Sequence, residues 1–169
     1  MVEKRKNIFK GRLLNLFKGE KTLPNGRKAY FEEIDHPGAS LIVPFTKNKV
    51  VFIRQYRAVI GKYLWELPAG ILNKGETPVR CAKRETREET GYEIKVIKKI
   101  GYIYTSPGFS NELIHVYTAE CGERKETGLD YGEVIKVKLL SKKEIKKFFK
   151  EGKISDSKTI AALSFAGLL

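Results

Sequence analysis

The stretch that most restricts the fold is the run of residues 69–92, AGILNKGETPVRCAKRETREETGY, which joins a glycine turn to a segment dense in carboxylates. Thr77 is a favourable helix N-cap, and Pro78 suits the first position of a helix. Gly91 stands where a helix can end in the left-handed conformation. Together these signals predict a helix from about Pro78 to Thr90.

Three glutamates of this predicted helix, Glu85, Glu88 and Glu89, are spaced i, i+3 and i+4 and therefore share one face. Like charges at that spacing repel one another by roughly 0.2–0.5 kcal/mol per pair. A bound divalent cation removes this penalty, and carboxylate oxygens are ligands that Mg²⁺ prefers. The alternative is a solvated acidic face paired with the basic residues of the same helix, which are Arg80, Lys83, Arg84 and Arg87.

The wider spacing favours the metal-site hypothesis. It resembles the Nudix box, G-x5-E-x7-R-E-U-x-E-E-x-G-U, in which U is a bulky aliphatic residue. The seven fixed positions of that pattern are all matched, by Gly70, Glu76, Arg84, Glu85, Glu88, Glu89 and Gly91. The sequence departs from the pattern at both U positions, which hold Thr86 and Tyr92. Those positions pack the helix and do not bind metal, so the departures leave the chemistry intact.

The length of 169 residues predicts one domain with a sizeable core. The sequence contains no apolar run of 18 residues, which predicts no membrane span, and its start lacks a secretory h-region. Cys81 and Cys121 have no metal-like spacing and suggest a reducing compartment. We therefore expect a cytoplasmic protein.

The net charge of +13 and the pI near 9.7 raise the question of a nucleic-acid partner. The lysines are spread along the chain, with a modest concentration in SKKEIKKFFKEGK, and no RNP, KH, zinc-finger or helix-turn-helix signature is visible. Richness in Lys, Glu and Ile also fits a protein from a hot environment. The hypothesis is a basic surface that suits an anionic small-molecule substrate, with a nucleic-acid-binding module as the rival from another class.

The rest of the chain predicts mostly strands. Residues 8–22 and 27–34 flank the turn Leu23-Pro24-Asn25-Gly26 and predict an N-terminal β-hairpin. Further strands are predicted over 39–45, 50–56, 93–104, 112–119 and 133–140, and further helices over 141–151 and 156–169. This order fits a mixed sheet between helices, an α/β (α+β) class. The resemblance implies the Nudix α/β/α sandwich over 39–169, after an N-terminal β segment over 1–38.

Three further features resemble ADP-ribose pyrophosphatases within the Nudix family. Pro107 lies 16 residues after Gly91, and the segments WELPAG and RQYR also match that group. The N-terminal hairpin resembles the segment through which those enzymes form homodimers and contact the adenosine end of the substrate. The same segments occur in relatives that act on other nucleoside diphosphate sugars, so the sugar stays open. The resemblance thus implies hydrolysis of ADP-ribose to AMP and ribose 5-phosphate. The lack of a long apolar run, by itself, predicts no membrane partner.

The resemblance also implies roles for individual residues. Glu85 and Glu89 are expected to be the main ligands of Mg²⁺, or alternatively Mn²⁺, with Glu88 in support and the carbonyl of Ala69 as a further ligand. Glu76 and Arg84 are expected to pair and brace the loop. The expected substrate-binding residues are Arg54, Arg57, Glu66, Pro107, Gly108 and Glu112. For Glu112, a role at the start of a strand is an equal alternative.

The general base is left open by the sequence. In relatives it often comes from a glutamate on a later loop, which corresponds here to residues 127–133. Glu133 is the first choice, Asp130 the second and a glutamate of the box the third. A catalytically silent domain that only senses a nucleotide is disfavoured, because such a domain would not need the full carboxylate cluster.

Overall fold

The computed structural model describes residues 2–11, 14–129, 131 and 134–169. In these residues the chain forms two β-sheets, three α-helices and one 3₁₀ turn, η1 (Ala58–Ile60). The strands are β1 (Val2–Lys10), β2 (Asn15–Thr22), β3 (Lys28–Asp35), β4 (Ala39–Thr46), β5 (Lys49–Arg57), β6 (Lys62–Glu66), β7 (Ala69–Ile71), β8 (Tyr92–Tyr104), β9 (Leu113–Arg124) and β10 (Ile135–Leu140). The helices are α1 (Pro78–Thr90), α2 (Lys142–Lys150) and α3 (Ser157–Phe165).

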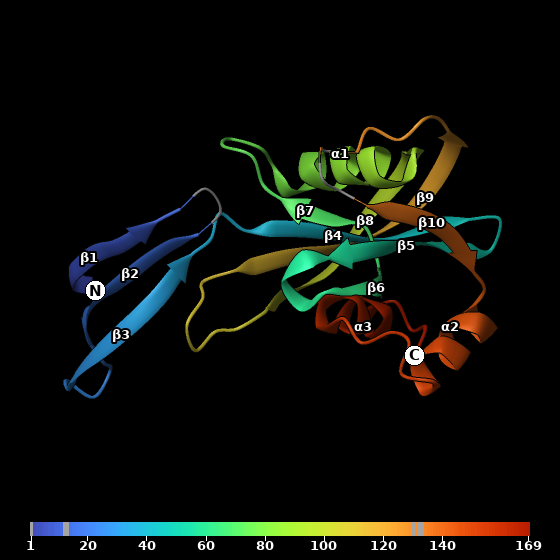
Figure 1. The fold of residues 1–169 in the computed structure, drawn as a ribbon. Helices are drawn as coiled ribbons and strands as arrows, with labels where there is room; N and C mark the ends of the chain where they lie inside the picture. The colour runs from blue at the N-terminus through green and yellow to red at the C-terminus, as the bar shows by residue number, and fades with distance from the viewer. Residues whose placement is uncertain (1, 12–13, 130, 132–133) are drawn as a thin grey trace.

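The main sheet is mixed and lies between helices, as the sequence predicted. Its order is β10-β5-β4-β9-β8, with β6 paired to β5 and β7 paired to β4. The β4–β9 pair is parallel, whereas the other pairs of this sheet are antiparallel. Figure 1 shows α1 covering one face of this sheet, while α2 and α3 lie on the other. The predicted α/β/α class is therefore confirmed.

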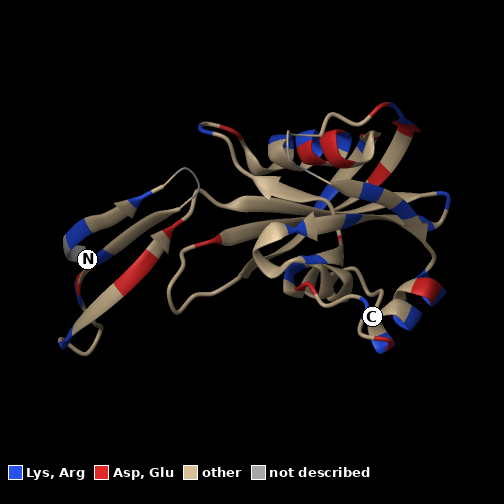
Figure 2. Cartoon of the chain, viewed as in Figure 1, with Lys and Arg blue, Asp and Glu red and all other residues tan. Residues whose placement is uncertain are grey.

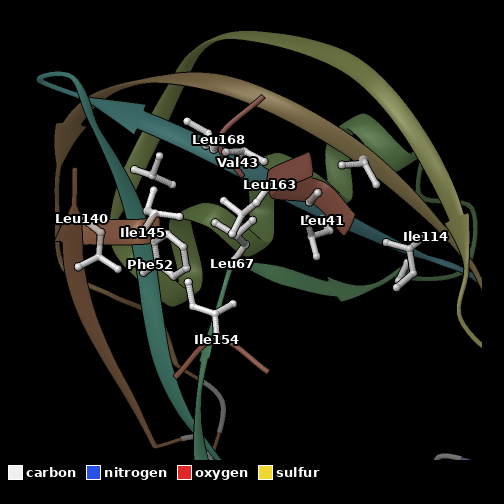
Figure 3. Packing of buried hydrophobic residues seen from close by; sticks show 14 residues of the cluster. Leu41, Val43, Phe52, Leu67, Ile114, Leu140, Ile145, Ile154, Leu163 and Leu168 are labelled. Atoms are coloured by element: carbon white, nitrogen blue, oxygen red, sulfur yellow. The ribbon is translucent and has the colours of Figure 1, made fainter. Parts of the chain in front are cut away.

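Both faces of the central strands are buried, which explains their continuous apolar runs. On the side of α2 and α3, Leu41 and Phe52 belong to a large core cluster, part of which Figure 3 shows in close-up. On the side of α1, Ile42 packs with Ala82 and Tyr117 in a smaller cluster. Because side chains alternate between the faces of a strand, neighbouring residues of β4 and β5 serve different layers.

The N-terminal sheet has the order β1-β2-β3 and stands to one side of the main sheet (Figure 1). The predicted turn between β2 and β3 is present, with the Gly26 N–H donating to the Leu23 carbonyl at 2.9 Å. The single strand predicted over 8–22 is wrong, because it is divided into β1 and β2. The Gly11 N–H donates to the Leu14 carbonyl at 2.8 Å across this reversal. A loose alternation of apolar and polar residues continues through such a reversal and does not reveal it.

The loop between β8 and β9 ties the two sheets together. The Ile34 N–H donates to the Phe109 carbonyl at 2.7 Å, and the Asn111 side chain donates to Asp35 Oδ1 at 2.9 Å. The same Asn111 accepts a hydrogen bond from the His36 N–H at 2.7 Å. The loop that carries Pro107 therefore fixes the end of β3 against the main body.

Helix α1 has the predicted bounds, for the predicted reasons. Thr77 Oγ1 accepts from the Arg80 N–H, and Gly91 takes φ of 77° and donates to the Arg87 carbonyl. At the first departure from the family pattern, Thr86 is fully buried and donates its hydroxyl to the Ala82 carbonyl at 2.8 Å. A polar residue at this packing position thus has its hydrogen bond satisfied within the helix.

The two C-terminal helices are also capped. Ser141 and Glu144 form a capping box at α2, and Asp156 caps α3. Among the residues described above, no helix is both long enough and apolar enough to cross a membrane.

Candidate active site

The turn before the helix fits closely against one of the predicted ligands. A Cβ atom added to Gly70 would lie 1.9 Å from the carboxyl carbon of Glu85, far inside any allowed contact. Gly70 belongs to β7, which pairs with β4, so the turn is held by the sheet while Glu85 comes from α1. Only glycine lets this backbone approach the carboxylate so closely, which explains the first fixed position of the pattern.

Arg84 gathers three of the four carboxylates of the box around one guanidinium. It binds Glu76 in a bidentate manner, with Nε–Oε1 of 3.0 Å and Nη2–Oε2 of 2.9 Å. Its Nη1 also donates to Glu85 Oε1 and to Glu88 Oε2. The hydrogen bonds from Arg84 hold the pKa of Glu76 below its usual range, and those to Glu76 raise the pKa of Arg84. The expected Glu76–Arg84 pair is present.

Glu89 is more buried than Glu85 and Glu88, the other two glutamates of the helix. Glu89 is only 3% exposed, and its Oε2 accepts a hydrogen bond from the Ala69 N–H at 3.1 Å. This bond places the peptide of Ala69 beside the carboxylate. Figure 2 shows acidic and basic residues following one another along α1. Acidic side chains of α1 thus face the turn formed by Ala69 and Gly70.

These groups suit a divalent cation in their chemistry without forming a finished cage. In the part of the chain that the structure describes, no three His, Cys, Asp or Glu side chains are arranged as a ready-made metal site. Mg²⁺ is commonly held by one or two carboxylates, waters and substrate phosphates, and does not require an all-protein cage. The close approach of Gly70 to Glu85 and of Ala69 to Glu89 brings oxygen donors together at one turn. The donor set therefore fits this ion.

A second arginine, Arg57, binds the carboxylate of Glu66, which belongs to the WELPAG segment. Its Nε donates to Glu66 Oε1 at 2.7 Å and its Nη2 to Glu66 Oε2 at 2.6 Å. Glu66 is fully buried, whereas the Arg57 side chain is 39% exposed. The Nε–Nη2 edge of the guanidinium therefore contacts the buried Glu66 carboxylate, while part of the Arg57 side chain reaches solvent.

Two residues that sequence reasoning missed complete this cluster. Lys158 of α3 donates from Nζ to Glu66 Oε2 and, at 2.8 Å, to Asp156 Oδ1. Burial alone would raise the pKa of Glu66, but the bonds from Arg57 and Lys158 outweigh it and hold that pKa below its usual range. Lys158 follows Glu66 by 92 residues, so no local spacing could have indicated the contact.

Arg54 does not lie beside Arg57. The alternation of side chains along β5 sends the two arginines to opposite faces of the sheet. The guanidinium of Arg54 lies 4.8 Å from the ring centre of Tyr63 and 5.9 Å from that of Trp65. Trp65 packs on Phe148 of α2, so Arg54 lies on the side of β5 that faces α2.

The predicted residues of the β8–β9 loop lie next to the N-terminal sheet. Pro107 and Gly108 line a groove of about 540 Å³, together with residues of β2, β3 and the adjoining turn. Glu112 accepts from Thr105 Oγ1 at 2.7 Å and faces His36 Nε2 at 3.6 Å. Both alternatives for Glu112 are compatible with this position, since it lies directly before β9 and remains partly exposed.

The loop after β9 runs along the C-terminal end of α1. The Gly128 N–H donates to the Glu88 carbonyl at 2.9 Å, and the Lys125 N–H donates to the Gly91 carbonyl at 2.7 Å. Glu126 and Glu88 help to line a hollow of about 430 Å³ at this point. Glu126 is an acidic residue that sequence reasoning missed, one position before the loop considered for the base. The two named candidates for the base, Glu133 and Asp130, lie outside the described residues.

Comparison with protein families finds one match that spans most of the chain. A model described as "NUDIX domain" matches residues 35–163. This range includes the turn at Ala69, helix α1 and the cluster around Glu66.

Several curated proteins are similar to this chain over most of their length. The methanol dehydrogenase activator of Bacillus methanolicus is 40% identical over 98% of this chain and 91% of its own. The ADP-ribose pyrophosphatase of Bacillus subtilis (strain 168) is 36% identical over 97% of this chain and 90% of its own. The GDP-mannose pyrophosphatase of Escherichia coli (strain K12) is 36% identical over 76% of this chain and 72% of its own.

A solved structure titled "Crystal structure of ADP compounds hydrolase" superposes with a TM-score of 0.83. It covers 98% of this chain and 91% of its own, at 17% sequence identity. At that identity the likeness concerns the fold, including the N-terminal sheet.

Proposed function

The chain belongs to the Nudix family, and from this premise we propose that it hydrolyses the diphosphate bond of ADP-ribose to AMP and ribose 5-phosphate with the aid of Mg²⁺. The observation that carries the proposal is the close approach of the Glu85 and Glu89 carboxylates to the Ala69–Gly70 turn. The choice of ADP-ribose rests on the Bacillus subtilis relative, which matches the chain nearly from end to end.

In this proposal Glu85 and Glu89 are the main metal ligands, Glu88 supports them and the Ala69 carbonyl adds one oxygen. A bound Mg²⁺ would neutralise phosphate charge and lower the pKa of a water molecule. Arg84 holds Glu76 and so keeps the loop and helix in register, while its Nη1 pairs with Glu85 and with the 41% exposed Glu88. Mn²⁺ is expected to substitute for Mg²⁺, because it also accepts oxygen ligands.

Arg57 is proposed to bind the diphosphate. Glu66 occupies Nε and one Nη2 hydrogen, and the guanidinium has five donors, so donors remain for phosphate oxygens. Arg54 is left out of this contact because it lies on the opposite face of β5. The substrate is proposed to contact the β8–β9 loop where this loop meets the N-terminal sheet. The contact residues there are Pro107, Gly108 and Glu112.

Glu133 is proposed as the general base. Its chain neighbour Val134 accepts at its carbonyl from the Tyr56 N–H, directly before Arg57 in β5. At the other described end of the loop, Gly128 is bonded to Glu88. Both ends of this loop are therefore fastened near the proposed site, which supports a base from this segment over one from elsewhere.

The N-terminal sheet is proposed to form a homodimer interface. Tyr30 is 86% exposed and Phe9 is 56% exposed, which is unusual for aromatic residues without a partner surface. A broad groove crosses the same sheet and is lined by Arg5, Lys6, Lys18, Gly19, Glu20, Tyr30, Phe31, Glu32, Gly108 and Phe109. Light scattering coupled to gel filtration tests the proposal, and a monomer at micromolar concentration would contradict it.

A substrate panel tests the function itself. Purified protein with Mg²⁺ is given ADP-ribose, GDP-mannose, NADH, a dinucleotide polyphosphate and a nucleoside triphosphate, and products are separated by chromatography. We expect the largest kcat/KM for ADP-ribose and AMP as a product. Preference for GDP-mannose would favour the second candidate, which the relative from Escherichia coli supports. No turnover of any diphosphate would overturn the proposal.

The nucleic-acid rival is tested separately by filter binding across a range of salt concentrations. A nucleic-acid module predicts tight binding with a steep salt dependence. Figure 2 shows that basic residues are distributed over several elements, with acidic residues among them. We therefore expect only weak retention of RNA or DNA at physiological salt.

A further inference from the structure

We propose that Lys158 is a positioning residue, which holds Glu66 so that Arg57 presents its guanidinium to the substrate diphosphate. This proposal rests on the proposed function, because it assumes that Arg57 binds a diphosphate. It adds helix α3, which lies far from the box in sequence, to the parts of the chain that shape the site.

The carboxylate of Glu66 is held by donors from two different elements. Arg57 of β5 reaches both oxygens with Nε and Nη2 at 2.7 and 2.6 Å. Lys158 of α3 shares the oxygen Oε2 with Nη2 of Arg57. Because Glu66 is fully buried, no water competes for these positions at the carboxylate. The plane of the carboxylate, and with it the plane of the guanidinium, is therefore fixed by three donors.

Lys158 is itself held at the start of its helix. Asp156 caps α3 by accepting from the Thr159 N–H at 3.0 Å with Oδ2, and its Oδ1 accepts from Lys158 Nζ at 2.8 Å. The Lys158 side chain is only 18% exposed, so its long stem is constrained by packing. The ammonium group therefore has few alternative positions.

The same helix end is fastened to the segment that follows Glu66. Thr159 Oγ1 accepts from the Leu67 N–H at 3.0 Å, and both groups are buried. Two residues later, the Ala69 N–H donates to Glu89. The N-terminus of α3 is therefore connected through one short segment both to Arg57 and to a proposed metal ligand.

Stability alone gives a weak reason for Lys158 at this place. Arg57 already balances the charge of Glu66 in a bidentate pair. A second buried ion pair carries its own desolvation penalty, so such pairs often contribute little net stability. What Lys158 adds is a fixed orientation of the Glu66 carboxylate and therefore of the Arg57 guanidinium. The Nη1 of Arg57 has no acceptor among the described residues, and the Arg57 side chain is 39% exposed, so this nitrogen is the one that can meet the substrate.

The experiment compares three variants under saturating Mg²⁺, with the panel substrate that the wild type hydrolyses best. Lys158→Met keeps most of the apolar stem and removes the ammonium, whereas Lys158→Arg keeps a cation. Lys153→Met is the matched control, since Lys153 is 51% exposed and pairs with Glu151 on the surface. Thermal unfolding is recorded for each variant beside kcat and KM.

For Lys158→Met we expect KM to rise about tenfold while kcat stays within about threefold, because a diphosphate contact made in both ground and transition states affects KM alone. Lys158→Arg should recover most of this loss, and Lys153→Met should match the wild type. An unchanged KM in Lys158→Met, even with a lower melting temperature, would mean a purely structural role and overturn the proposal. A fall in kcat alone would overturn it as well.

A binding measurement separates this proposal from the proposed function. Titration calorimetry with inorganic pyrophosphate and Mg²⁺ needs no turnover and no particular sugar. We expect Lys158→Met to bind this probe about tenfold more weakly than the wild type, a change equivalent to about 1.4 kcal/mol. If Lys158→Met does not fold, Lys158→Gln takes its place. It also removes the ammonium, its shorter polar side chain suits the site better than an apolar one, and it should weaken binding in the same direction. Equal binding by variant and wild type, or none by the wild type, overturns the positioning role whatever the substrate panel shows.

Discussion

Two arginines of this protein each hold glutamates, and they do so in opposite ways. Arg84 spreads its donors over Glu76, Glu85 and Glu88, and its side chain is 27% exposed. Arg57 places two donors on the single, fully buried Glu66, which Lys158 also contacts. The Arg84 cluster is local in sequence and its carboxylates are partly exposed, so we call it the open cluster. The Arg57 cluster joins distant segments around a fully buried carboxylate, so we call it the closed cluster.

The difference indicates a division of labour. Two of the carboxylates around Arg84 are those proposed to receive metal, so each must be able to leave the arginine when a cation binds. Partly exposed ion pairs are weak enough to allow this. The carboxylate under Arg57 is buried, and breaking such a contact by removing one partner is costly. The first cluster is therefore suited to binding and the second to holding a shape.

The largest effect is expected for Glu89→Gln, because Glu89 lies between the two clusters. Its Oε2 accepts from the Ala69 N–H, and its negative charge is among those that raise the pKa of Arg57, after the hydrogen bond to Glu66. Glutamine can still accept the Ala69 bond, so the fold should persist. Removing a residue that hydrogen-bonds a metal ligand lowers activity by up to about 100-fold. Because Glu89 is proposed to be a ligand itself, we expect kcat of Glu89→Gln to fall at least that far. Steady-state kinetics measure it.

Glu93→Gln is the matched control for this prediction. Glu93 lies just beyond α1, is 42% exposed and pairs with Arg87 and Lys125 on the surface. We expect its activity to equal that of the wild type. Turnover of Glu89→Gln near that of the control would contradict the ligand assignment.

The next effect concerns the open cluster alone. In Gly70→Ala the added methyl group would overlap the Glu85 carboxylate, which must then move away from the turn. A displacement near 1 Å at a reacting centre can reduce the rate by about 100-fold, and we expect a loss of that order in kcat/KM. The protein should remain folded by circular dichroism, since the Glu85 side chain can rotate.

Gly152→Ala is a control for Gly70→Ala, because it is expected to lower stability without lowering activity. Gly152 has φ of 66° with open space around its Cα, so alanine there strains the backbone without meeting a neighbour. We expect it to lose about 1 kcal/mol of stability and no activity. If Gly70→Ala instead lost stability and kept its activity, the close contact with Glu85 would have no catalytic meaning.

How much of this could be predicted from sequence depends on the range of the contacts. The box helix, its caps and the Glu76–Arg84 pair follow from spacings of a few residues, so the sequence predicts them correctly. The contact between Lys158 and Glu66 depends on how α3 packs near β6, which no local pattern encodes. The placement of Arg54 away from Arg57 does follow from strand alternation, and that signal was available in RQYR.

The N-terminal strands show a different kind of limit. The turn at Leu23–Gly26 has strong turn residues and is predicted, whereas the reversal near Gly11 has a single glycine within a basic, weakly alternating run. The alternation of apolar and polar residues indicates which face of a strand is buried. A chain reversal is indicated only by turn-forming residues such as Gly, Pro, Asn and Asp. Where that chemistry is sparse, two strands resemble one long strand in the sequence.

A smaller effect tests the rigidity of the closed cluster. Arg57→Lys removes the planar fork and leaves one ammonium for two oxygens of a buried carboxylate. We expect a loss of about 2 kcal/mol in the free energy of unfolding, because one charge-assisted hydrogen bond to a buried acid goes unmade. The same change at Arg84 should cost less than about 1 kcal/mol, since none of its partners is fully buried and Glu88 is 41% exposed. Urea unfolding measures both, and equal losses would erase the distinction between the two clusters.

The smallest effect is a pH dependence within the open cluster. The hydrogen bonds from Arg84 lower the pKa of folded Glu76 below the ordinary value of 4.5. The ionised carboxylate therefore adds stability above about pH 4.5, and this contribution disappears as the pH falls through the lower, folded pKa. Glu76→Gln should cost about 1 kcal/mol or less near pH 7, and the difference from wild type should shrink steadily below pH 4.5. Glu88→Gln is the matched change at a carboxylate that is 41% exposed, and its effect should be small near neutral pH. If Glu76→Gln lost the same stability at pH 3 as at pH 7, the brace between loop and helix would not depend on the charge of Glu76, and packing alone would hold the turn against α1.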